Sequence, residues 1–132
     1  MASGRRIARL LIALGAACAI AACRPSPTYD VSWTVQHTAD TAGGTASIRL
    51  IVRGGGGTPV TGARLTLEGH MAHPGMAPVV TGMMETAPGQ YEARLGLTMS
   101  GEWRLVVSGT LADGQRVTWE HPMSVEGAAP AA

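Results

Sequence analysis

A short segment in the middle of the chain combines two histidines, two methionines and two prolines: Glu68-Gly69-His70-Met71-Ala72-His73-Pro74-Gly75-Met76-Ala77-Pro78. Pro-Gly suits the central positions of a type II β-turn, because proline fixes φ at the first position and glycine adopts the positive φ that the second requires. His73 and Met76 would then flank the turn with Cα atoms less than about 7 Å apart. An imidazole and a thioether at that separation can share a soft ion, and thioether sulfur favours Cu(I). The alternative is that the methionines fill gaps in an apolar core and the histidines are loop residues that bind no ligand.

A second pair of candidate ligands, His121 and Met123, lies near the end of the chain. Residues two apart in a strand project from the same face, with Cα atoms roughly 7 Å apart. The pair shares this parity with apolar neighbours, so a core position is the competing interpretation. Pro122 favours a strand edge or a strand end, where the loops of a sandwich gather. We therefore expect His70, Met71, His121 and Met123 to complete a copper site around His73 and Met76.

Met99 is a further candidate ligand. It continues the apolar parity of Tyr91, Leu95 and Leu97, which favours a core position, yet it also stands at a predicted turn. Its spacing to the second pair gives Met-x21-His-x-Met. This spacing resembles the second half of the motif of periplasmic copper chaperones of the PCuAC family. The first half is missing, because Pro88 stands where that motif would place a histidine.

The N-terminus has the features of a bacterial lipoprotein signal, predicted to span residues 1–22. It has a basic start and an apolar stretch from Leu10 to Ile20 that is too short to span a bilayer. Ile20-Ala21-Ala22-Cys23 resembles a lipobox, whose cysteine is acylated and becomes the first mature residue; Cys18 is a weaker alternative. Residues 23–30 would form a Pro-rich tether. The predicted location is the periplasmic face of a membrane. The outer membrane is favoured because Arg24 replaces the aspartate typical of retention at the inner membrane.

The mature chain would therefore offer no free thiol. Cleavage would remove Cys18 and lipidation would consume Cys23, the two cysteines of the sequence, so a metal site needs histidine, methionine, carboxylate or backbone ligands. Removal of three of the ten basic residues leaves seven positive charges against nine negative ones. This balance gives no basic patch for nucleic acid.

Short alternating segments predict an all-β fold. Apolar and polar residues alternate in several runs separated by turn signals, and no helical periodicity follows the signal. We expect Tyr91–Leu97 and Trp103–Val107 to form one β-hairpin and Asp113-Gly114 to turn another. Because Met83 and Met84 are adjacent, at least one should point into the core. The predicted domain, residues 31–126, is an immunoglobulin-like antiparallel β-sandwich of about seven strands, followed by a flexible tail at 127–132.

Residues 63–107 resemble the FixH/YtkA-like domain family. The resemblance rests on the Leu67–Pro78 run with its His-Pro-Gly-Met centre, then on Pro88–Ala93 and on Leu97–Leu105. It implies a small β-sandwich outside the cytoplasm. Proteins of FixH type are associated with maturation of a haem-copper oxidase beside a copper-exporting ATPase. Those proteins carry a transmembrane helix where this chain has a predicted lipid.

The sequence thus predicts a lipid-anchored periplasmic protein that binds copper, as Cu(I), and buffers it or exchanges it with a copper-donor or copper-acceptor protein. The alternative is a metal-free module whose turn docks onto a membrane protein complex, such as a haem-copper oxidase, during assembly. We do not expect an enzyme, because the sequence has no Ser/His/Asp set, carboxylate pair or cofactor motif.

Overall fold

The described part of the chain is built from β-strands, with one short 3-10 turn. The computed structural model describes residues 27–39 and 43–127. Within them, eight strands are formed where about seven were predicted. One of them, β5, consists of four exposed residues, so it has no alternation of burial that a sequence pattern can reveal. The elements are β1 (Asp30–Thr38), β2 (Gly44–Arg53), η1 (Gly55–Gly57), β3 (Arg64–Met71), β4 (Val79–Gly82), β5 (Met84–Ala87), β6 (Gln90–Leu97), β7 (Gly101–Thr110) and β8 (Arg116–Val125).

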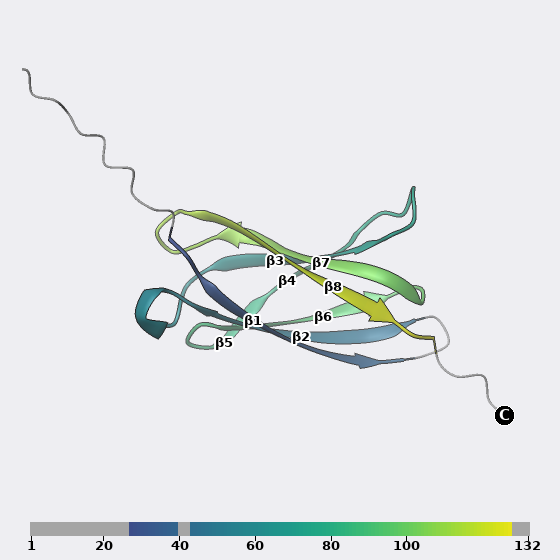
Figure 1. The fold of residues 1–132 in the computed structure, drawn as a ribbon, viewed down its shortest axis with the longest axis horizontal. Coiled ribbons are helices and arrows are strands. Elements are labelled where there is room, and N and C mark those ends of the chain that lie inside the picture. Colours follow the sequence, from purple (N-terminus) through teal and green to yellow (C-terminus); the bar gives the residue numbers. More distant parts are fainter. Residues whose placement is uncertain (1–26, 40–42, 128–132) are drawn as a thin grey trace, which may run out of the picture.

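The strands form two four-stranded antiparallel sheets that face one another (Figure 1). Sheet A has the order β1-β2-β6-β5, and sheet B has the order β4-β3-β7-β8. Sheet A corresponds to the ABED sheet of an immunoglobulin-like sandwich, and β3, β7 and β8 of sheet B correspond to its CFG sheet. The additional strand is β4, at the edge of sheet B. The predicted fold class is therefore confirmed.

The two predicted hairpins have different outcomes. The Asp113-Gly114 turn joins β7 to β8, which pair in register along their whole length, so this hairpin is confirmed. The predicted hairpin of Tyr91–Leu97 with Trp103–Val107 is wrong, because β6 belongs to sheet A and β7 to sheet B. Both strands are amphipathic, and each pairs with its other neighbour in sequence and with one distant strand: β6 with β5 and β2, and β7 with β8 and β3. The connection between them therefore crosses from one sheet to the other.

The core of the described residues lies between the sheets, and its side chains are apolar except for the hydroxyl of Tyr91 and the indole N–H of Trp103. Alternate residues of β2, β3, β6 and β7 point inward, as the period-2 pattern of these segments requires. Met83 packs against the core while Met84 is 74% exposed, which confirms the prediction for this adjacent pair. The buried residues are Ala46, Ile48, Leu50, Val52, Leu65, Leu67, Tyr91, Leu95, Leu97, Trp103, Leu105, Val107, Leu111, Val117 and Val125.

The antiparallel arrangement sorts the loops between two opposite ends of the sandwich (Figure 1). At one end lie the start of β1, the η1 turn and the β7–β8 turn. At the other end lie the β3–β4 loop of residues 72–78, the β6–β7 loop of residues 98–100 and the end of β8. The chain thus enters the sandwich at the end opposite these last three segments.

Two side chains fix the segment that carries the chain from sheet A to sheet B. The hydroxyl of Tyr91 donates a hydrogen bond to the carbonyl of Val60 at 2.7 Å and accepts one from the amide of Ala63 at 3.1 Å. Burial raises the pKa of Tyr91. The carboxylate of Glu85 accepts hydrogen bonds from the amides of Gly62 and Gly89, each at 3.1 Å.

The Glu85 contacts predict a pH dependence of stability. The Gly62 amide, and then the Gly89 amide, lower the pKa of Glu85 from 4.5 because they stabilise its charged form. Since the pKa is lower in the folded state, this stabilisation is present above pH 4.5 and is lost as the pH falls through the folded-state pKa. Glu85→Gln should lower the melting temperature at pH 7 slightly, because the carboxylate is exposed. The melting temperatures of Glu85→Gln and the wild type should converge in acid. The melting temperature of the control Glu126→Gln should equal that of the wild type at every pH.

Candidate functional site

His70 and Met71 lie within β3, beyond the point at which the alternating sequence pattern stops. Successive strand residues point to opposite faces of the sheet. His70 therefore lies on the outer face of sheet B, where its Nε2 is 2.8 Å from Oε2 of Glu68. Met71 lies on the inner face and packs against the core. The structure consequently separates these two predicted ligands.

Met71 and Met123 lie in one row across the inner face of sheet B, with Trp103 between them. Met71 pairs with Trp103, and Trp103 pairs with Met123. Because neighbouring strands are about 4.8 Å apart, the Cα atoms of the two methionines are separated by about 10 Å. Both methionines are half-buried, while Trp103 is only 4% exposed. Sequence patterns do not reveal this row, because it depends on the pairing of β3 with β7.

Met99 lies on the adjacent β6–β7 loop. The indole Nε1 of Trp103 donates a hydrogen bond to the Met99 carbonyl at 3.0 Å, which attaches this loop to the row. The Met99 side chain is 46% exposed, so the core position that its parity favoured is wrong. The chain leaves the strand after Leu97, and strand alternation no longer applies beyond that residue. The Met71 methyl carbon lies 3.2 Å from where a Cβ on Gly101 would be, so Met71 reaches toward this loop.

His73 and Met76 lie in the β3–β4 loop, which projects from the sandwich (Figure 1). Residues 72–78 are all exposed, and Met76 is 42% exposed. Gly75 has a φ of +80°, as the second central position of the predicted type II turn requires. The Ala72 amide donates a hydrogen bond to the Glu102 carbonyl at 3.1 Å, which fixes the base of the loop to β7.

His121 shares the inner face of β8 with Met123, as their spacing predicted. Its imidazole stacks on the indole of Trp33, with ring centroids 5.1 Å apart and an interplanar angle of 15°. Trp33 belongs to β1, so this stack joins the edge strand of sheet A to the edge strand of sheet B. His121 therefore has a packing role between the sheets. It lies two residues before Met123 on β8, farther from the end of the strand.

Four methionines thus lie at one end of the sandwich, on the end of β3, the β3–β4 loop, the β6–β7 loop and the last part of β8. We call this region the methionine end and define it by Met71, Met76, Met99 and Met123. Among residues 27–39 and 43–127, no group of three His, Cys, Asp or Glu side chains is arranged to hold a metal ion. Methionine sulfur is a soft donor, so the methionine end suits a soft ion such as Cu(I) better than Mg²⁺ or Ca²⁺.

Comparison with known proteins identifies the family of the chain. The family model described as YtkA-like matches residues 27–108, which is well over half of the chain. The protein is thus a small extended β-sandwich domain, and it belongs to the YtkA-like family. Comparison with curated proteins and with solved structures found no match. No helix in the part of the chain described above is long and apolar enough to cross a membrane. The predicted signal and Cys23 lie outside the described residues.

Proposed function

We propose that this protein is a lipid-anchored copper-binding protein of the periplasm that buffers Cu(I) or delivers it to a partner. The observation that carries the proposal is the gathering of Met71, Met76, Met99 and Met123 at one end of the sandwich. These methionines come from a strand end, two loops and another strand end. Thioether ligands select Cu(I) over harder ions.

The candidate ligands fall into two neighbouring groups. Met71 and Met123 flank Trp103 in the strand register, and Trp103 bonds the backbone carbonyl of Met99; His73 and Met76 lie on the exposed loop that follows Met71. The remaining candidates, His70 and His121, contact Glu68 and Trp33 and are left out of the proposed site. When bound, Cu(I) would be cargo, and thioether ligands hold it without the ready oxidation of a thiolate.

The position of the chain's entry supports a role in transfer. The strands of the sandwich have up to ten residues, and at about 3.3 Å per residue they span roughly 33 Å. A lipid at Cys23 would be tethered to the end where β1 begins, and the methionine end lies at the opposite end (Figure 1). The candidate ligands would therefore face away from the anchoring point, toward a donor or acceptor protein.

A Cu(I) titration tests the proposal. The protein, kept anaerobic, is titrated with Cu(I) against a coloured chelator. We expect the protein to withdraw one equivalent of copper from the chelator. The double variant His73→Ala and Met76→Ala should bind about tenfold more weakly, since the loss of exposed ligands costs on the order of 1.4 kcal/mol.

The same variant separates copper binding from the alternative function. The projecting loop of residues 72–78 also favours a metal-free module that docks onto a membrane protein complex. That alternative predicts no withdrawal of copper from the chelator, together with loss of a co-purified partner in the double variant. His70→Ala, on the outer face of sheet B, is the matched control and should bind copper like the wild type.

A further inference from the structure

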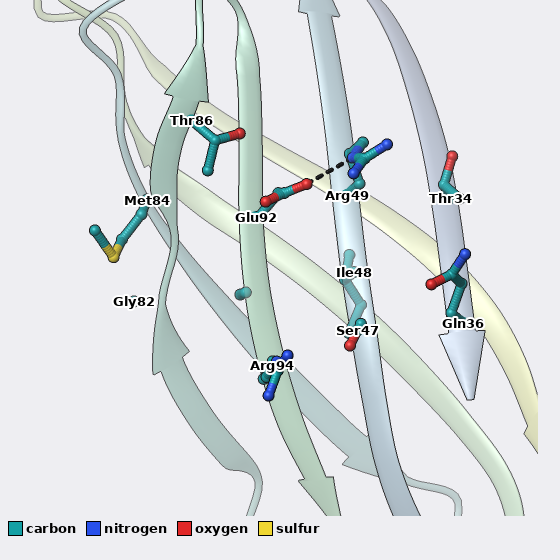
Figure 2. A pocket seen from close by; sticks show the side chains of 11 residues that line it. Thr34, Gln36, Ser47, Ile48, Arg49, Gly82, Met84, Thr86, Glu92 and Arg94 are labelled. Atoms are coloured by element: carbon teal, nitrogen blue, oxygen red, sulfur yellow. Dashed lines mark hydrogen bonds and ion pairs between the residues drawn. The ribbon is translucent and has the colours of Figure 1, made fainter. Parts of the chain in front are cut away.

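The outer face of sheet A carries a cleft that lies apart from the methionine end. Its volume is about 490 Å³, within the range of pockets that bind small molecules. Each strand of sheet A contributes to it, as Figure 2 shows. It is lined mainly by polar side chains that donate hydrogen bonds, among them Thr34, Gln36, Ser47, Arg49, Thr86 and Arg94.

The cleft has more positive than negative charge. Arg49 Nε donates to Glu92 Oε1 at 2.6 Å, and Glu92 is the one acidic residue of the lining. This contact uses one nitrogen of Arg49 and leaves its terminal amino groups free for a ligand. Arg94 makes no ion pair or side-chain hydrogen bond with any residue that the structure describes. The lining therefore contains two guanidinium groups and only one carboxylate.

The strand register brings these guanidinium groups to the same part of the sheet. Arg94 is directly opposite Ser47 on β2, and Arg49 lies two residues further along that strand. Such diagonal neighbours have Cα atoms about 7–8 Å apart, and long side chains bridge that distance. Figure 2 shows Arg49 and Arg94 on the same face, with Ser47 and Gln36 beside them. A ligand between the two arginines would also meet these polar groups.

We propose that this cleft binds a small anion that carries carboxylate or phosphate groups. The planar guanidinium group matches the oxygens of both groups and forms paired hydrogen bonds with them. The hydroxyl and amide groups of Ser47 and Gln36 add donors for the remaining ligand oxygens. A metal cation fits poorly, because the lining carries an excess of positive charge.

Calorimetric titration of the full chain in a non-ionic detergent tests this proposal. The probes are citrate, inorganic phosphate and glycerol 3-phosphate, in a buffer free of carboxylates and phosphates. We expect saturable binding of at least one probe, weakened by added salt. Arg94→Gln should weaken that binding at least tenfold. Arg116→Gln removes the same charge from an exposed position in sheet B and should leave it unchanged. Preference for glycerol 3-phosphate would identify a lipid headgroup as the source, and preference for citrate or phosphate a free anion.

A steric test is independent of charge. A Cβ on Gly82, which lines the cleft, would meet nothing within 4 Å, so Gly82→Leu should fill the cleft without disturbing the strands. A Cβ on Gly96 of β6 would also meet nothing within 4 Å, but Gly96 does not line the cleft, so Gly96→Leu is the control. We expect Gly82→Leu to abolish probe binding and Gly96→Leu to preserve it. Absence of saturable binding for all three probes, or equal binding by Arg94→Gln and the wild type, would overturn the proposal.

Discussion

Replacing Met71, Met99 and Met123 together by leucine is expected to weaken Cu(I) binding at least 100-fold, about 2.7 kcal/mol. Met71 and Met123 flank Trp103 in the strand register, Met99 lies on the loop whose carbonyl Trp103 bonds, and the three thioethers are the soft donors of the proposed site. Leucine keeps a similar volume and removes only the sulfur. Such volume-conserving exchanges usually lower the free energy of unfolding by less than about 1.5 kcal/mol at each site. The triple variant should therefore remain folded by circular dichroism while losing copper to the chelator.

The matched control for this variant is Met83→Leu with Met84→Leu. Met83 packs against the core and Met84 is 74% exposed, so the pair reproduces both environments at a distance from the methionine end. This control should bind Cu(I) like the wild type. Equal losses in both variants would indicate a general effect of removing methionine. Wild-type affinity in the triple variant would exclude the group around Trp103 and leave His73 and Met76 as the only ligands.

The parts of the fold that depend on local pattern were predictable from the sequence. Alternation identified the long strands, because each has one face on the core. The Asp113-Gly114 turn identified the β7–β8 hairpin, and Pro74-Gly75 identified the turn in the β3–β4 loop. In each case a few neighbouring residues determine the backbone conformation. The same local logic predicted His73 and Met76 on either side of this turn, and both residues lie on the exposed loop.

The parts that depend on strand partners were not predictable. The local pattern of β6 and β7 fits a hairpin as well as a crossing between sheets, and only pairing with distant strands decides between them. The row from Met71 through Trp103 to Met123 depends in the same way on the pairing of β3 with β7, which are distant in sequence, whereas its Trp103–Met123 half belongs to the predicted β7–β8 hairpin. The cleft on sheet A is a product of register in all four of its strands. Single-segment patterns contain no information on these contacts.

The role of the Tyr91 hydroxyl was also not predictable from the sequence, because its partners lie about thirty residues earlier in the chain. The sequence identified Tyr91 only as an inward-facing strand residue. In the structure its ring is fully buried, and its hydroxyl bonds the carbonyl of Val60 and the amide of Ala63. Tyr91→Phe keeps the ring and leaves these two backbone groups without their partner. We expect a loss of unfolding free energy of about 2–4 kcal/mol, since each unsatisfied buried group costs about 1–3 kcal/mol.

Tyr29→Phe is the control that separates the loss of these two bonds from the loss of a tyrosine hydroxyl in general. The Tyr29 hydroxyl donates a single hydrogen bond, to the side chain of Gln115 at 2.9 Å, near the surface. Its removal should cost about 0.5–1.5 kcal/mol, the usual net value of one such bond. Urea unfolding at pH 7 measures both variants. Tyr91 lies in β6 and fixes the segment between η1 and β3, away from the methionine end. Tyr91→Phe should therefore unfold at a lower urea concentration than the wild type, yet bind Cu(I) with wild-type affinity while folded. A stability equal to that of Tyr29→Phe would mean that water replaces the Tyr91 hydroxyl at both backbone groups.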